Sequence, residues 1–124
     1  MNKKDELTGR IIGCAIEVHR NLGPGLLESA YQQCLARELS IHEIPFEIEK
    51  AIPVHYKGIE IDCGYRVDFL VEDRVILELK AVDSVTGIHK AQLLTYMKLA
   101  NATTGLLINF NTKVLKDGIQ RFKL

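Results

Sequence analysis

The sequence has few cysteines, no net charge and no long hydrophobic run, and each absence excludes a class of protein. Its three cysteines, Cys14, Cys34 and Cys63, are odd in number and lack the spacing of a metal-binding motif, so we expect reduced, packed thiols in a cytoplasmic protein. Sixteen basic and sixteen acidic residues cancel, which argues against a protein that coats nucleic acid through bulk charge. No apolar stretch is long enough to cross a bilayer, and the opening MNKKDELTGR is not a signal peptide.

What remains is the composition of a soluble globular protein. Hydrophobic residues make up 47% of the chain and charged residues 26%, with no internal repeat and no low-complexity segment. A chain of 124 residues is long enough to bury one hydrophobic core. We therefore predict a single domain spanning residues 1–124.

The hydrophobic pattern predicts two helices, a group of strands, a third helix and a returning strand. The first helix is capped by Thr8 and stops at Gly23-Pro24. The second runs from about Leu26 to Leu39, with Leu27 on its buried side. The third runs from Ser84 or Thr86 to about Asn101, with Ile88 on its apolar side. The strands are 46–56 and 59–63 joined by a turn at Lys57-Gly58, then 65–71, 75–81, 105–110, and a weaker one after Asp117-Gly118. This order predicts an α/β sandwich, a mixed central β-sheet flanked by helices.

Two opposite charges stand on one face of the predicted strand VILELKAV, residues 75–82. Because side chains alternate along a strand, Glu78 and Lys80 point one way while Leu77 and Leu79 point the other. Burying an unpaired charge is costly. The two charges therefore either pair with each other at the end of an edge strand or lie at the mouth of a site.

Asp68 lies in the preceding strand and can stand directly across from Glu78. That alignment requires residues 72–74 to form a three-residue loop, since a two-residue loop would shift the register. Two facing carboxylates repel each other, and a hard divalent cation such as Mg²⁺ removes the conflict because it binds carboxylates, waters and phosphate oxygens. Lys80 would then hold or help deprotonate an attacking water, or offset charge developing on a phosphate.

Four further polar residues are candidates for the same site. Gln92 and Tyr96 are one helical turn apart, and His89 precedes Gln92 by three residues. The alternative to a role in the site is that Tyr96 is a core residue with a hydrogen-bonded hydroxyl and that Gln92 lies at the boundary of the core. For His89 we favour the alternative, a histidine on the surface. Glu28 stands in the first turn of its helix, where the helix dipole stabilises a carboxylate. It also shares the more buried face with Tyr31, where a glutamate needs a partner such as a metal ion.

The C-terminal segment is locally basic. Between residues 112 and 124 a single acid, Asp117, faces four basic residues, Lys113, Lys116, Arg121 and Lys123. These side chains either contact nucleic-acid phosphates or keep an exposed edge strand in solution. The same edge is a candidate contact surface for a homo-oligomer.

Taken together, these residues resemble the PD-(D/E)XK nuclease superfamily and, within it, the GxxExxY family. Gly25, Glu28 and Tyr31 in GLLESAY match the pattern that names the family. The blocks LGPGLLESAY, DCGYRVDFLVED, ILELKAV, AQLLTYMKL and GLLINFN follow in the family's order, and the resemblance runs from about Leu7 to Leu124. The sequence differs from the literal motif at one position, because Val67 precedes Asp68 where the motif has proline.

The resemblance implies a restriction-endonuclease-like fold and a role for each candidate residue. Asp68 and Glu78 would be metal ligands and Lys80 the catalytic lysine. Glu28 resembles the additional acid that the superfamily supplies from its first core helix, and the backbone carbonyl of Leu79 is a further ligand in that pattern. Gln92 and Tyr96 resemble the Gln-x-x-x-Tyr element of RecB-like nucleases.

The function that this resemblance implies is metal-dependent hydrolysis of phosphodiester bonds in DNA, with Mg²⁺ or Mn²⁺ as cofactor. A second hypothesis is a catalytically inactive module that binds nucleic acid or a partner protein on a nuclease fold, because the zero net charge provides no basic track for the strands beside a cut. A third is a purely structural salt-bridge network. Removing Asp68 or Glu78 would cost stability in the third case and would not in the first.

Overall fold

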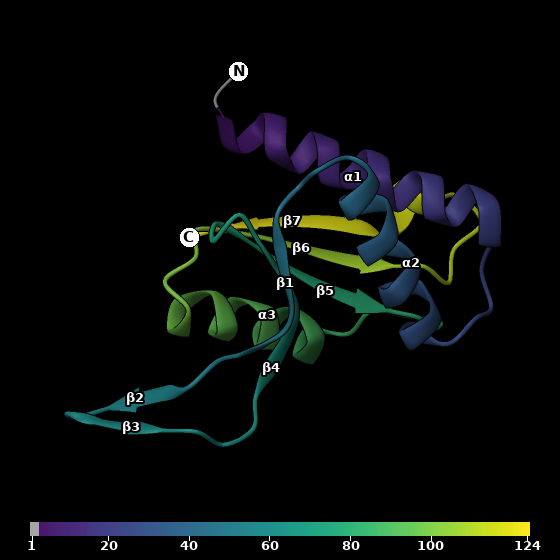
Figure 1. Ribbon diagram of the computed structural model, residues 1–124. Helices are drawn as coiled ribbons and strands as arrows, with labels where there is room; N and C mark the ends of the chain where they lie inside the picture. Colours follow the sequence, from purple (N-terminus) through teal and green to yellow (C-terminus); the bar gives the residue numbers. More distant parts are fainter. Residues whose placement is uncertain (1–2) are drawn as a thin grey trace.

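The computed structural model describes the backbone of residues 3–124 and the side chains from Glu6 onward (Figure 1). The helices are α1 (Lys3–Leu22), α2 (Glu28–Ile41) and α3 (Gly87–Leu99), with a short 3₁₀ turn η1 (Leu115–Gly118). The strands are β1 (Phe46–Ala51), β2 (Val54–Tyr56), β3 (Ile59–Ile61), β4 (Arg66–Val71), β5 (Val75–Lys80), β6 (Thr104–Asn109) and β7 (Ile119–Lys123).

Five of the strands form the central sheet, in the order β1-β4-β5-β6-β7. β5 and β6 are parallel and the other neighbouring pairs are antiparallel. The predicted mixed sheet flanked by helices is thereby confirmed. β5 lies in the middle of this sheet, so the alternative that placed Glu78 and Lys80 on an edge strand is wrong.

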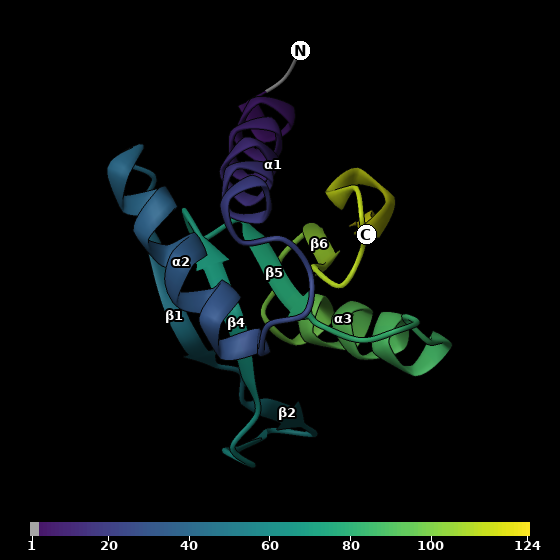
Figure 2. The same cartoon turned by 90° about the vertical axis from the view of Figure 1, so that its right-hand side faces the viewer.

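The two faces of the sheet are covered by different helices, as the two views in Figures 1 and 2 show. Leu77 and Leu79 of β5 belong to a core cluster that includes residues of α1 and α2. Ile76 points the other way and packs with Leu93 and Met97 of α3. β6 is buried along its whole length, as expected for an apolar strand covered on both faces. The alternation of side chains along β5, predicted from the sequence, therefore decides on which face of the sheet, and against which helices, these side chains pack.

The predicted strand 46–56 is divided in two. β1 ends at Ala51 and β2 begins at Val54, with Pro53 between them. Proline has no N–H with which to continue a ladder, so the chain can leave the central sheet there. β2 and β3 then pair only with each other, around the predicted turn at Lys57-Gly58, and project from the body as a separate arm (Figure 1).

Three local expectations from the sequence are wrong. Thr8 does not cap α1, which begins at Lys3; Thr8 is buried, and its Oγ1 accepts a hydrogen bond from Arg121 Nη2 at 2.8 Å. Leu27 is 77% exposed because it is the extended N-cap residue of α2, where helical spacing does not yet apply. Ile88, in the first turn of α3, is 73% exposed.

The three thiols are all free, but they are not equally packed. Cys14 is buried, Cys34 is half-buried and Cys63 is exposed. The expectation of packed cysteines is therefore wrong for Cys63, which lies in the irregular segment between β3 and β4.

Candidate metal and catalytic site

The turn between β4 and β5 brings Asp68 and Glu78 together. The strands pair Phe69 with Leu77 and Val71 with Val75, and residues 72–74 form the connecting loop. This is the three-residue loop that the alignment of the two acids requires, and its register places Asp68 across from Glu78.

Hydrogen bonds fix both carboxylates at this point. The Asp68 backbone N–H donates to Glu78 Oε1 at 3.3 Å. The Leu79 backbone N–H donates to Asp68 Oδ2 at 2.7 Å. Each acid is thus held by the backbone of the opposite strand, and the sheet sets their separation.

The environment of the two acids opposes their ionisation. Burial, followed by the charge of Asp68, raises the pKa of Glu78 to about 8, against the opposing effect of Lys80. Burial also raises the pKa of Asp68, while the Leu79 N–H and Lys80 lower it. Near neutral pH the pair therefore retains a proton, and a cation between the acids would displace it.

A cavity of about 220 Å³ opens beside Asp68. Its lining residues come from four elements and are Glu28, Ser29 and Gln32 of α2, Glu49 of β1, Asp68 of β4 and Leu79 of β5. Glu28 is the first residue of α2 and is exposed, so the expectation that it lies on the buried face is wrong. It lines the same cavity as Asp68, from the start of the helix.

Tyr31 fixes the start of α2, and this explains two residues of the Gly25, Glu28, Tyr31 pattern. The Tyr31 hydroxyl donates to the Gly23 carbonyl at 2.6 Å and accepts from the Leu26 N–H at 3.1 Å. Its fully buried ring stacks on Phe110 with centroids 4.4 Å apart. Gly25 has φ +100°, a conformation that strongly favours glycine. The loop is thereby held so that Glu28 emerges at the cavity.

Glu49 is an acid at the site that the sequence pattern did not indicate. β1 pairs Ile48 with Phe69 and Lys50 with Val67, so the register puts Glu49 across from Asp68. Its φ of +53° is unusual for a residue other than glycine. The charge of Glu49 raises the pKa of Asp68, and Glu49 Oε1 accepts a hydrogen bond from Gln32 Nε2 at 3.3 Å. Only the pairing of β1 with β4 reveals it, and no local pattern does.

Two residues of α3 complete the surroundings of Glu78. Tyr96 is 7% exposed, and its pKa is raised by burial and then by the charges of Glu78 and Tyr65, while a hydrogen bond with the Gln92 side chain lowers it. Gln92 and Tyr96 are therefore joined, next to Glu78. His89 contributes to the start of α3, where its Nδ1 accepts a hydrogen bond from the Thr86 N–H at 3.1 Å.

A family model of the PD-(D/E)XK nuclease superfamily matches residues 5–122. The chain belongs to this superfamily. No curated protein and no solved structure gave a match. PD-(D/E)XK nucleases generally depend on a divalent metal, and none of the helices in residues 3–124 is long and apolar enough to span a membrane.

The donor set of this superfamily member suits a hard divalent cation. Glu28, Glu49 and Asp68 all present carboxylates to one cavity, and Leu79 lines it beside them. Oxygen ligands of this kind are those that Mg²⁺ and Mn²⁺ prefer. Burial and the charge of Asp68 raise the pKa of Glu78 in spite of Lys80, so a cation bound beside these acids would favour their ionised forms. The ligand types of this cavity therefore suit Mg²⁺ or Mn²⁺.

The four basic residues of the C-terminal segment are spread over the superfamily fold. Lys113 and Lys116 lie in the connection that leaves β6 at Asn109, which pairs with Lys80, so they belong to the site end of the sheet. Arg121 pairs with Leu106 in mid-strand and hydrogen-bonds Thr8, and Lys123 pairs with Thr104 at the opposite end. The fold does not bring the four together.

Proposed function

We propose that this protein is a metal-dependent nuclease of the GxxExxY family that hydrolyses phosphodiester bonds of DNA. The observation that carries the proposal is the pair of facing acids, Asp68 and Glu78, both with raised pKa values and next to Lys80 on β5. Facing carboxylates repel each other when both are ionised, and a divalent cation bound between them would remove that repulsion.

In this proposal the metal is Mg²⁺ or Mn²⁺, held by Glu28, Asp68, Glu78 and the Leu79 carbonyl, with Glu49 as a further acid. When bound, such an ion polarises the phosphoryl oxygens and lowers the pKa of a bound water. The remaining roles belong to side chains of the protein itself.

Lys80 is the proposed catalytic lysine. It follows Glu78 by two residues on the same strand, so it lies on the same face of β5, and it is half-buried. Its ammonium would orient the attacking water and offset the charge that develops on phosphate. Tyr96 and Gln92, joined by their hydrogen bond beside Glu78, would orient Lys80 or the substrate.

Nucleic acid would approach from the end of the sheet where β5 and β6 finish. Lys113 and Lys116 are exposed there and would contact phosphates beside the cut. Arg121 and Lys123 lie further along β7 and would contribute only if an oligomer brought their edge to a second site. The single domain and the homo-oligomer both stay predictions.

The test combines metal binding with cleavage. Calorimetric titration of Mg²⁺ and Mn²⁺ should give binding to the unchanged protein and to Glu43→Ala, an exposed acid on the loop after α2, and none to Glu78→Ala. On a panel of DNA and RNA substrates, Lys80→Ala should lose roughly 10²-fold or more in cleavage rate. Lys98→Ala, at the exposed end of α3, should cleave like the unchanged protein.

A catalytically inactive binding module is the second candidate. The dispersal of the basic residues along β7 and its preceding connection favours it, because they form no single track for DNA. It predicts nucleic-acid binding without metal and without cleavage. No metal binding by the unchanged protein, even with nucleic acid present, would decide for this candidate.

A further inference from the structure

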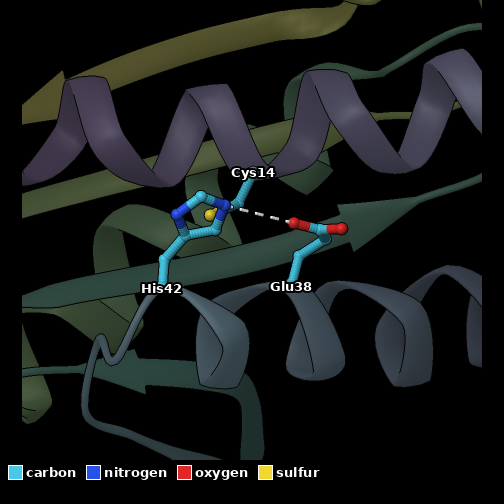
Figure 3. Close-up of side chains that lie close together, drawn as sticks. All are labelled: Cys14, Glu38 and His42. Atoms are coloured by element: carbon cyan, nitrogen blue, oxygen red, sulfur yellow. Dashed lines mark ion pairs between the residues drawn. The ribbon is translucent and has the colours of Figure 1, made fainter.

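A second group of metal-ligating side chains lies between α1 and α2, outside the acidic site (Figure 3). Cys14 comes from the middle of α1, and Glu38 and His42 come from the end of α2 and its C-cap. Their ligand atoms all lie within 4.8 Å of one another. Glu28 and Glu38 are ten residues apart on α2, which places the two sites about 15 Å apart along the helix.

We propose that Cys14, Glu38 and His42 bind a divalent transition metal of borderline softness, of which Zn²⁺ is the chief example. A thiolate, an imidazole and a carboxylate are the ligands that Zn²⁺ takes, whereas Mg²⁺ prefers oxygen alone. The proposal does not depend on nuclease activity, because none of these side chains lines the cavity beside Asp68.

The geometry requires only small adjustments. Zinc bonds of about 2.0–2.3 Å in a tetrahedron hold the ligand atoms roughly 3.3–3.6 Å apart. Glu38 Oε2 and His42 Nε2 are already 3.4 Å apart. Because all the ligand atoms lie within 4.8 Å of one another, the approach toward Cys14 is no more than about 1 Å. Cys14 is buried, but Glu38 is half-buried and His42 is exposed. The side chains of Glu38 and His42 therefore have room to move toward Cys14.

The surroundings leave room for the ion and for a fourth ligand. The three residues line a cavity of about 640 Å³ that also includes Arg10 and Glu17 of α1. Arg10 Nη2 donates to the His42 carbonyl at 2.9 Å and so holds the end of α2 against α1. A three-residue set with an open position leaves the fourth place to water, or to Glu17, which lies one helical turn beyond Cys14.

Binding would link the two helices that cover one face of the sheet. The metal replaces the Cys14 thiol proton, which is released to solvent, and forms bonds to Glu38 and His42. α1 and α2 would then be cross-linked near the end of α2 that is remote from Glu28. Because the unfolded chain lacks this arrangement, a metal concentration about 100 times Kd would raise the folded-to-unfolded ratio about 100-fold.

The experiment is a Co²⁺ titration of the metal-free chain in excess Mg²⁺, which competes with Co²⁺ for sites made of oxygen ligands alone. We expect one equivalent of Co²⁺ to produce a thiolate-to-cobalt charge-transfer band that Zn²⁺ then abolishes. Cys14→Ser should lose the band. The controls Cys34→Ser and Cys63→Ser should keep it, and so should Glu78→Gln, since the site is independent of the nuclease proposal.

His42→Ala guards against a misfolded Cys14 variant, because His42 is exposed. It should bind Co²⁺ about tenfold or more weakly, with an unchanged circular dichroism spectrum. A band that persists in Cys14→Ser, unchanged affinity in His42→Ala, or no band in the unchanged protein would each overturn the proposal. Mg²⁺ binding that fails in the same protein would count against the nuclease proposal alone.

Discussion

Replacing Glu78 with glutamine tests whether the facing acids strain the metal-free protein. Folding raises the pKa of Glu78 from 4.5 to about 8. The folded state therefore binds more protons than the unfolded state between these two pH values, and stability falls as pH rises through that window. Between pH 5 and pH 9 a shift of this size lowers the free energy of unfolding by about 4 kcal/mol.

Glutamine has nearly the same shape and no charge, so Glu78→Gln should escape this loss. In urea unfolding with EDTA, we expect the variant to match the unchanged protein at pH 5 and to be about 2–4 kcal/mol more stable at pH 9. Glu43→Gln, an exposed control, should stay within about 0.5 kcal/mol of the unchanged protein at both pH values. Adding Mg²⁺ at pH 9 should stabilise the unchanged protein and leave Glu78→Gln unaffected.

The result that would refute the reasoning is a Glu78→Gln variant that is less stable than the unchanged protein by the same amount at both pH values. Glu78 would then be an ionised partner of Lys80 in a structural salt bridge, and removing it would leave an unpaired buried charge. That outcome would favour the structural explanation of the charges on β5.

The remaining predictions concern the residues that surround the two acids. Tyr31→Phe removes the hydroxyl that bridges Gly23 and Leu26 and should cost about 1–3 kcal/mol in urea unfolding. It should also weaken Mg²⁺ binding in calorimetry, because Glu28 is held less firmly, and unchanged values for both would contradict the role given to Tyr31. Glu49→Gln removes a like charge beside Asp68, so the pKa of Asp68, followed by NMR titration, should fall. Mg²⁺ affinity should fall as well, and an Asp68 pKa that does not move would show that Glu49 does not face it.

The order of helices and strands is predictable from the sequence because it rests on local periodicity. The alternation in VILELKAV separates Leu77 and Leu79 from Glu78, and the structure buries them accordingly. The three-residue loop that aligns Asp68 with Glu78 is likewise local, since residues 72–74 lie between two adjoining strands. Turn length and strand register are linked by geometry over a few residues.

The errors occur where a neighbour in space overrides the local signal. Thr8 has the chemistry of a helix cap, yet it is buried in mid-helix against Arg121, 113 residues away. The strand-like pattern of residues 46–56 predicts one strand, but only 46–51 have a partner in the central sheet. Such contacts depend on which helices and strands pack together, and they produce no periodic pattern of hydrophobic residues in the sequence.

The sequence by itself determined the order of the helices and strands, and it put Glu78 and Lys80 on one face of β5, because these features follow from spacing along the chain. It also allowed Asp68 to face Glu78, on the condition that residues 72–74 form the loop between the two strands. Only the tertiary structure decided that Glu49 of β1 stands across from Asp68, and that Cys14 meets Glu38 and His42 between two helices. The physical reason is that side-chain alternation acts over a few residues, whereas the cores that pack α1 on α2 and order the sheet are formed by contacts between distant parts of the chain.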